Sequence, residues 1–187
     1  YTLFNNSMDA ARKEADLACS SLNNDICNIV RNSIDITDHI SKVYGDMISS
    51  GIIPLTGESD KDAMLINFLK NHSENISVFA YMDRDDNIYT AIKQDNQEIK
   101  VIYGNSAAYV QNADSSDWLT LAKTATSSFT LPIGISDWSS VPTVRSIFPI
   151  FDDNDFFFGA LYIEIDMKSM LSQITKTVNS YTDAVYI

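Results

Sequence analysis

One apolar stripe runs without a break through the first 50 residues, and it restricts the fold more than any other feature of this sequence. Its members lie three or four residues apart, and their average spacing of about 3.6 residues is the α-helical period. The stripe consists of Phe4, Met8, Ala11, Ala15, Ala18, Leu22, Ile26, Ile29, Ser33, Ile36, Ile40, Val43 and Met47. It predicts one helix about 65 Å long at 1.5 Å per residue. Such a helix is longer than a compact domain needs, so part of it should project or pack against a partner.

The chain after residue 50 has the pattern of an α+β domain. Ser59 is the expected N-cap of a second, short helix, and another short helix is expected to begin at Trp118. Runs rich in β-branched and aromatic residues predict five antiparallel strands. These runs are 76–82, 88–93, 99–104, 143–151 and 156–165, and a closing helix is expected over 167–181. Five strands with helices packed to one side make an α+β fold. The aromatic-rich loop region 105–140 is where we expect a ligand pocket.

Charge and composition exclude several classes of protein. The chain has 13 Lys and Arg against 25 Asp and Glu, a net charge of −12, which repels nucleic-acid phosphates. Its 45% hydrophobic residues suffice for a packed core. No window approaches 18 consecutive apolar residues, so no transmembrane helix is expected. Cys19 and Cys27 lie about 12 Å apart along a continuous helix, beyond the reach of a disulfide. They are expected to be reduced core residues unless the helix breaks at Asn23-Asn24.

Three passages of the chain carry a family resemblance. The first is the long helix followed by NISVFAYMDRDDNIY. The second is Asp117-Trp118-Leu119 with FTLPIGISDW, and the third is VRSIFPIFDDNDFFFGALYIEIDMKSML. In this order they resemble the first hairpin, the pocket loop, and the closing hairpin and helix of the Cache family of extracytoplasmic, PAS-like sensor domains.

The resemblance implies a bacterial membrane receptor that binds a small molecule outside the cytoplasm, with no cofactor. Residues 1–50 would form the signalling helix, and 51–180 the PAS-like sensing module. Residues 181–187 (YTDAVYI) are similar to the first strand of a second module of the double Cache type. The ligand would be an amino acid, a carboxylate or an amine, and the long helix offers a surface for a homodimer.

The family's amino-acid-binding members carry Arg-x-Trp-Tyr before the pocket helix and an Asp after the last strand. Here Trp118 matches, but Ser116 stands in place of Arg and Leu119 in place of Tyr. Asp166 falls where the Asp is expected, and Arg145 is the candidate for the missing carboxylate clamp. Each of these three residues also has an alternative role that involves no ligand. Trp118 would be a core residue, Asp166 would be the N-cap of the closing helix, and Arg145 would lie on the outward face of its strand.

Five further residues complete the predicted ligand-binding set. Tyr81, Asp83 and Tyr103 lie on the first strands, where a tyrosine suits either a pocket wall or an ordinary sheet. Asp137 and Trp138 lie in the predicted pocket loop.

Metal binding and catalysis have little support in the sequence. Asp83-x-Asp85-x-Asn87 begins like a calcium loop, but Ile88 and Gln94 stand where that loop needs Gly and Glu, which favours a hairpin turn. His39 and His72 have no ligand-spaced partner. No nucleophile elbow, P-loop, dinucleotide-binding or C-x-x-C motif is present, so the chain is not expected to be an enzyme.

The sequence therefore predicts the sensing domain of a chemoreceptor, a histidine kinase or a cyclic-dinucleotide enzyme. The alternative is a protein-interaction or dimerisation module without a small-molecule ligand. An enclosed, polar-lined cavity between the sheet and residues 105–140 would favour sensing, whereas a filled core would favour interaction.

Overall fold

A computed structural model describes residues 2–72, 75–105, 117–136, 138 and 141–185. Its helices are α1 (Thr2–Ser49), α2 (Glu58–Asn71), α4 (Asp117–Thr124) and α5 (Met167–Val185). Its strands are β1 (Ile76–Asp83), β2 (Asn87–Lys93), β3 (Ile99–Asn105), β4 (Phe129–Ile135), β5 (Pro142–Phe151) and β6 (Phe157–Asp166). None of the helices in these ranges has a stretch long and apolar enough to cross a lipid bilayer.

The chain divides into two compact units. One comprises residues 1–34 and 169–187, and the other comprises residues 35–168. In the first unit, the Tyr181 hydroxyl of α5 donates to Asp25 Oδ2 of α1 at 2.6 Å and lies 2.8 Å from Ser21 Oγ. These contacts join the two helices of that unit.

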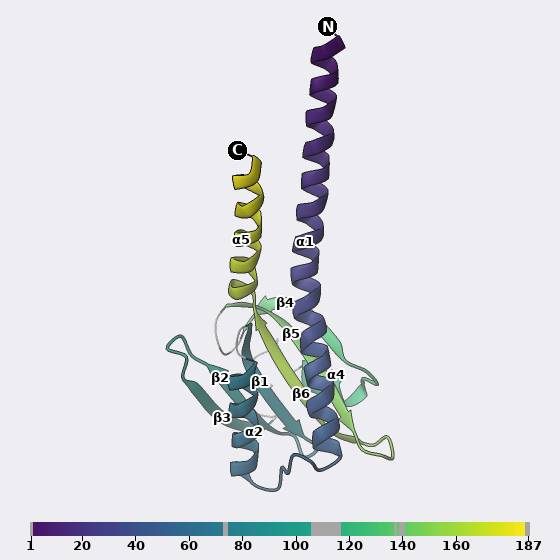
Figure 1. The fold of residues 1–187 in the computed structure, drawn as a ribbon. Helices are drawn as coiled ribbons and strands as arrows, with labels where there is room; N and C mark the ends of the chain where they lie inside the picture. The colour runs from purple at the N-terminus through teal and green to yellow at the C-terminus, as the bar shows by residue number, and fades with distance from the viewer. Residues whose placement is uncertain (1, 73–74, 106–116, 137, 139–140, 186–187) are drawn as a thin grey trace. The chain divides into compact units, whose positions relative to one another are not determined.

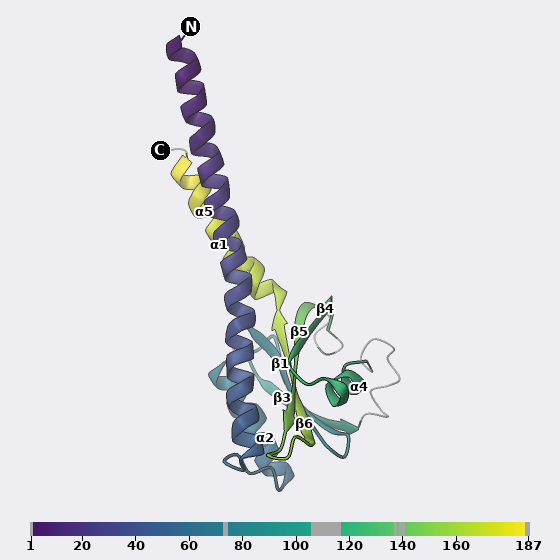
Figure 2. The same cartoon turned by 90° about the vertical axis from the view of Figure 1, so that its right-hand side faces the viewer.

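The second unit is built on one antiparallel sheet of six strands in the order β3-β2-β1-β6-β5-β4 (Figure 1). The last part of α1 and α2 lie on one face of this sheet, and α4 lies on the other (Figure 2). We call these the α2 face and the α4 face. Each face carries its own apolar cluster, since alternate residues of a strand point to opposite sides.

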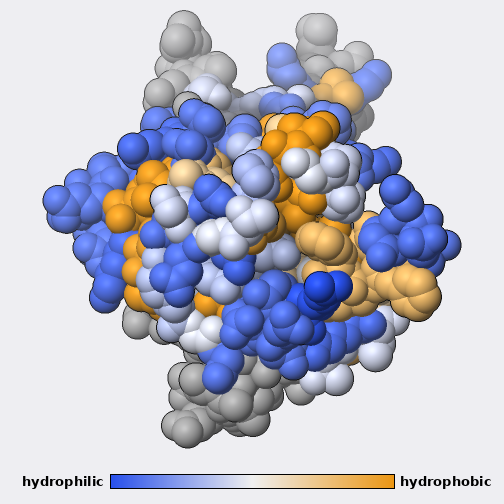
Figure 3. Space-filling model, turned by 90° about the horizontal axis from the view of Figure 1, so that it is seen from below, coloured by the Kyte–Doolittle hydropathy of each residue, from blue (hydrophilic) through white to orange (hydrophobic). Residues whose placement is uncertain are grey.

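The cluster on the α2 face joins α2 and the end of α1 to the central strands. Phe68 of α2 stacks on Phe79 of β1 with ring centroids 3.6 Å apart, and Tyr44 of α1 meets Phe68 edge-on. The surface at the lower end of the unit is a mosaic of hydrophilic and apolar side chains (Figure 3).

The predicted α+β, PAS-like class and the long helix are confirmed, but the strand count is six rather than five. The additional strand, β4, lies in the stretch that was expected to be loop because it contains Pro132 and Gly134. A proline is tolerated there because β4 is an edge strand. The register also shifts between Leu131 and Gly134, as expected for an irregular edge.

Two local predictions were wrong. The N-cap of α2 is Gly57 rather than Ser59, and Asp60 Oδ2 accepts a hydrogen bond from the Gly57 backbone N–H at 3.3 Å. Residues 181–185 belong to α5 where a strand was expected, because the closing helix continues through Val185. The division into 1–50, 51–180 and 181–187 remains a prediction.

Candidate functional site

The α4 face brings together three of the eight residues expected to bind a ligand, namely Trp118, Trp138 and Arg145. Its apolar floor comes from the central strands, and α4 covers it with Trp118, Leu119 and Ala122. The floor residues are Val78, Ala80, Met82, Ile88, Ile147, Ala160 and Tyr162. Helix α4 presents this apolar side because positions 118, 119 and 122 share one face of a helix.

Three aromatic rings meet on this face. The Trp118 ring lies 4.8 Å from that of Tyr162, and the Trp138 ring meets the same tyrosine edge-on at 5.3 Å. Trp118 and Tyr162 are each 2% exposed. Tyr162 was not among the predicted site residues, because a tyrosine in an apolar strand is normally predicted to be a core residue.

Glu164 is the most unusual side chain of this face, because it has no exposed surface. The Tyr162 hydroxyl donates to Glu164 Oε1 at 2.7 Å. Burial of a carboxylate is costly unless donors or cations surround it, so the buried Glu164 is a candidate binding group. Sequence reasoning missed Glu164, although a signal was present: it is the one charged residue in the otherwise apolar run 156–165.

Three more polar atoms on this side are buried without a hydrogen-bond partner among the described residues. They are Trp118 Nε1, Thr143 Oγ1 and Arg145 Nε. Buried donors in native proteins are nearly always satisfied. A ligand that enters here would find an indole N–H and a hydroxyl available.

Arg145 belongs to the same face, because it pairs in register with Glu164 on β6 and with Leu131 on β4. Its Nη2 donates to the Pro132 carbonyl oxygen at 3.1 Å, so the guanidinium reaches over the edge strand. A Cβ at Gly134 would overlap the guanidinium. Gly134 therefore leaves the space that Arg145 occupies.

A cavity of about 400 Å³ opens beside Trp138. Its other lining residues are Ile92, Lys93, Gln94, Asp95 and Asn96 of the β2 end and the following turn. Ile92 also packs against the apolar cluster of the α4 face. This cavity lies beside the aromatic residues and has a volume suited to a small molecule, but Trp118, Tyr162 and Glu164 do not line it.

Asp166 caps α5 in this structure. Its Oδ1 accepts a hydrogen bond of 2.7 Å from the Lys168 backbone N–H, which satisfies one free donor of the first helical turn. Contact between Asp166 and a ligand remains a prediction. Asp137 lies outside the described residues.

Tyr81 and Tyr103 lie on the α2 face, opposite Trp118. Burial raises the pKa of Tyr81, with a further contribution from the negative charge of Asp83. The Tyr103 hydroxyl donates to the Asp62 carboxylate of α2 at 2.6 Å. The structure does not bring these tyrosines together with Trp118, because β1 and β3 direct them to the other side of the sheet.

The Asp83 carboxylate makes two sets of structural contacts, one within the β1–β2 turn and one with α2. Its Oδ1 accepts hydrogen bonds of 3.0 Å from the backbone N–H groups of Asp85 and Asn87, which makes the predicted hairpin turn. Its Oδ2 lies 3.5 Å from Lys61 Nζ, and Lys61 also donates to the Tyr89 hydroxyl at 2.7 Å. This arrangement fixes α2 to the sheet. In the described part of the chain, no three His, Cys, Asp or Glu side chains form a metal-binding group.

The remaining reactive side chains are structural or exposed. His72 ends α2 with its ring 5.1 Å from Phe68, and partial burial lowers its pKa. Cys19 and Cys27 are free, as expected, but they are exposed and do not belong to a core. Neither cysteine belongs to the apolar stripe of the helix, so neither lies on its apolar side.

No protein-family profile matches this sequence, and no curated protein sequence matches it. Several solved structures, however, match the structure of this chain. The extracellular domain of the histidine kinase vpHK1S-Z8 matches with a TM-score of 0.66 and 14% identity over 89% of this chain and 63% of that one. A structure of methyl-accepting chemotaxis protein X matches with a TM-score of 0.66 and 14% identity over 87% and 65%.

The sensory domain of the Campylobacter jejuni chemoreceptor Tlp3, solved with isoleucine bound, matches with a TM-score of 0.59 and 14% identity over 84% of this chain and 64% of that one. The chain has the fold of these sensory domains. This confirms the expected likeness to Cache-type sensors at the level of the fold. The chain spans a little under two thirds of the length of each of these three structures.

Proposed function

We propose that this chain is the ligand-sensing domain of a bacterial receptor, and that it binds a small molecule carrying an ammonium group on the α4 face. The buried Glu164 carboxylate carries this proposal: it accepts a hydrogen bond from Tyr162, whose ring contacts those of Trp118 and Trp138. A carboxylate attracts an ammonium group, and aromatic faces attract it further through cation–π interaction.

The likeness of fold to chemoreceptor and histidine-kinase sensory domains supports a sensing role outside the cytoplasm. In this proposal the parent protein is anchored in the membrane and passes the signal to a chemotaxis, kinase or cyclic-dinucleotide module. The sensing chain itself catalyses no reaction.

The ligand class follows from two oppositely charged groups on one face. Glu164 suits the ammonium end, and Arg145, one strand away in register, suits a carboxylate. An amino acid carries both groups, whereas a simple amine would use Glu164 alone. The unpartnered Trp118 Nε1 and Thr143 Oγ1 would supply further donors to the carboxylate.

Signalling in this proposal depends on α1. Its segment 35–49 belongs to the same unit as the sheet. A ligand that binds one arrangement of this unit more tightly than another shifts the population toward it. A displacement of α1 would carry that shift onward.

A thermal-shift screen of amino acids, carboxylates and amines tests the proposal. A ligand at 100 times its dissociation constant should raise the free energy of unfolding by about 2.7 kcal/mol. Amino acids or amines should stabilise the chain, and carboxylates without an amine should not. Stabilisation by carboxylates alone, or by no compound of the set, would contradict the ammonium site.

Two variants then place the ligand. Trp118→Phe keeps a ring in the core and removes the indole N–H, and Glu164→Gln removes the negative charge. Both should weaken binding of the hit roughly tenfold or more, because each removes a buried hydrogen-bonding or charged group. Glu14→Gln, an exposed residue of α1, serves as the matched control and should bind as the original chain does.

One observation favours the alternative of a dimerisation module. Ile36 and Val43 of α1 are 58% and 42% exposed and lie seven residues apart, which places them on one side of the helix. A second copy of α1 would cover them in a homodimer. Light scattering after size-exclusion chromatography should give a dimer for the original chain and a monomer for the double variant Ile36→Glu, Val43→Glu. A monomeric original chain would contradict this alternative.

A further inference from the structure

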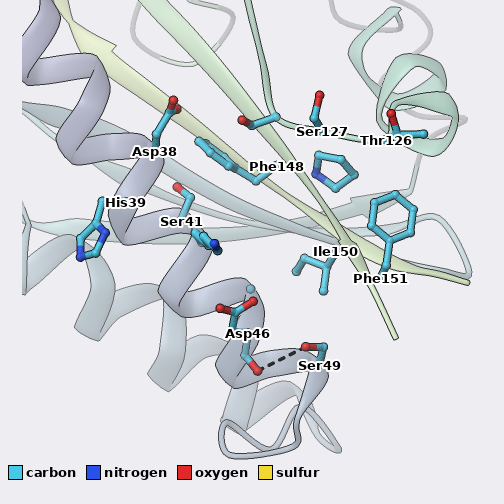
Figure 4. Close-up of a pocket in the computed structure, with 14 residues that line it drawn as sticks. Asp38, His39, Ser41, Asp46, Ser49, Thr126, Ser127, Phe148, Ile150 and Phe151 are labelled. Carbon is cyan, nitrogen blue, oxygen red and sulfur yellow. Dashed lines mark hydrogen bonds between the residues drawn. The ribbon is translucent and has the colours of Figure 1, made fainter. Parts of the chain in front are cut away.

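A second cavity lies on the other side of the sheet, away from the site proposed above. It is a groove of about 630 Å³ between α1 and β5, within the unit of residues 35–168 (Figure 4). Its floor is the uncovered edge of β5, where Phe148 and Ile150 lie on the α1 side and Pro149 and Phe151 complete the lining. This volume falls in the range of small-molecule sites, and the floor is entirely apolar.

The groove exists because β4 leaves part of β5 uncovered. The pairing of β4 with β5 ends at Phe129 and Ile147, so from Phe148 onward no described strand pairs with β5 on that edge. The segment Thr126–Ser128, which precedes β4, forms the opposite rim with three hydroxyl groups. The result is an apolar floor with one polar rim.

The other wall is a single stripe of α1. Its residues are Asp38, His39, Ser41, Lys42, Gly45, Asp46 and Ser49. From 38 to 49 the stripe extends about 16 Å at 1.5 Å per residue, so the groove is long and narrow. A linear molecule fits such a shape better than a compact one.

The α1 wall carries two carboxylates, Asp38 and Asp46, about 12 Å apart along the helix. Neither carboxylate accepts a hydrogen bond from another described residue or forms an ion pair with one. Partial burial and the neighbouring charge of Asp35 raise the pKa of Asp38, as expected for a carboxylate that lacks a cation. Lys42 lies between the two carboxylates but is exposed, and its long side chain can hold the ammonium group in solvent.

The middle of the wall offers space and an unused hydroxyl. Ser41 has no exposed surface, and its Oγ has no hydrogen-bond partner in the described part of the chain. Gly45 has no side chain to fill the groove, and a Cβ there would lie 3.6 Å from Ile150. A longer side chain at position 45 would occupy the groove.

We infer that this groove binds a linear aliphatic polyamine, whose methylene chain lies on the β5 floor and whose terminal ammonium groups pair with Asp38 and Asp46. The rim hydroxyls and Ser41 accept hydrogen bonds from the amine nitrogens. Two carboxylates against one lysine, in a chain of net charge −12, favour a cation over an anion. Because the ligand contacts both α1 and β5, it acts on α1 independently of the site on the α4 face.

Isothermal titration with spermidine at about 0.15 M salt tests the inference, since salt screens non-specific attraction to an acidic surface. Spermidine should bind with a stoichiometry of one. Putrescine, which is too short to reach both carboxylates, should bind more weakly, and uncharged 1,8-octanediol should not bind. Absence of spermidine binding, or equal affinity for all three probes, would overturn the inference.

Variants identify the groove as the place of binding. Gly45→Leu should abolish binding and Gly45→Ala should retain it, and circular dichroism checks that both fold. Ser128→Lys, an exposed rim position that leaves the core untouched, should also weaken binding by adding a positive charge.

Charge variants separate this groove from other sources of affinity. Asp38→Asn and Asp46→Asn should each weaken spermidine binding roughly tenfold. Asp16→Asn, an exposed carboxylate of α1 outside the groove, should leave it unchanged. Equal losses in all three variants would mean non-specific attraction. Loss of binding in Glu164→Gln would place spermidine on the α4 face, and either result would overturn the inference.

Discussion

The Tyr162 hydroxyl donates a 2.7 Å hydrogen bond to Glu164 Oε1 in a part of the sheet where neither residue is more than 2% exposed. The two residues are neighbours on the same side of β6, so the strand itself sets their distance. A buried carboxylate held by a phenol beside two indoles is an arrangement that a purely structural core has little reason to contain. This pair is the centre of the proposed sensing site.

Tyr162→Phe should lower the free energy of unfolding by about 1–3 kcal/mol, because the ring is kept while the buried carboxylate loses a donor. In the Glu164→Gln background the same change should cost less, since a neutral amide needs the hydroxyl less. Urea denaturation of the two single variants and the double variant measures this coupling. Additive effects would contradict a carboxylate that depends on Tyr162.

Lys61→Met should destabilise the fold without affecting ligand binding. Lys61 holds Asp83 and Tyr89 on the α2 face, and its side chain is only 13% exposed. Loss of these contacts should cost about 1–3 kcal/mol of unfolding free energy. Urea denaturation measures the loss, and titration with the hit from the amine screen should give the original affinity. Lys100→Met, on an exposed position of β3, is the matched control.

Two glycine-to-alanine substitutions should have opposite effects on stability. At Gly159, a Cβ would lie 2.5 Å from the Met82 carbonyl oxygen and 3.0 Å from the Tyr81 ring, so strand β6 would have to move. At Gly45, a Cβ has ordinary contacts, and alanine favours a helix over glycine by roughly 1 kcal/mol. Thermal denaturation should therefore show a lower Tm for Gly159→Ala and an unchanged or higher Tm for Gly45→Ala. A stable Gly159→Ala variant would contradict the close approach of β1 and β6.

The Tyr103 phenol should lose its proton at a higher pH than an ordinary tyrosine does. Its hydrogen bond to the Asp62 carboxylate is the main cause that raises its pKa from 10.0 to about 12. A raised pKa means that the fold favours the protonated phenol, so this contribution to stability is complete below pH 10 and is lost as the pH rises toward 12. Ultraviolet titration of the phenolate band should show one tyrosine fewer near pH 12 in Tyr103→Phe. Loss of a tyrosine that titrates near pH 10 would contradict the hydrogen bond.

Local patterns predicted most of the secondary structure. The 3.6-residue period of the first 50 residues is helix α1, and the runs rich in β-branched and aromatic residues are five of the strands. β4 was missed because Pro132 and Gly134 disfavour a strand locally, and only pairing with β5 at an open edge makes that segment extended. Helix α1 continues through Asn23 and Asn24, in agreement with the unbroken stripe.

The site was predicted less completely, because a residue's face depends on pairing that the local sequence does not contain. Trp118, Trp138 and Arg145 lie on the α4 face, as a shared site requires. Tyr81 and Tyr103 lie on the other face, and one step of register decides between the two. Glu164 was not predicted, because the family pattern places its acidic residue at Asp166, which instead caps α5.

By itself, the sequence determined the class of the fold, the long helix and the acidic surface, because helical and strand periodicity and net charge are properties of consecutive residues. Only the tertiary structure decided which polar residues share a face and which are buried. It placed Glu164 beside Tyr162 among aromatic rings on one side of the sheet. It also opened a groove between α1 and β5 on the other, because the packing of distant segments sets burial and juxtaposition.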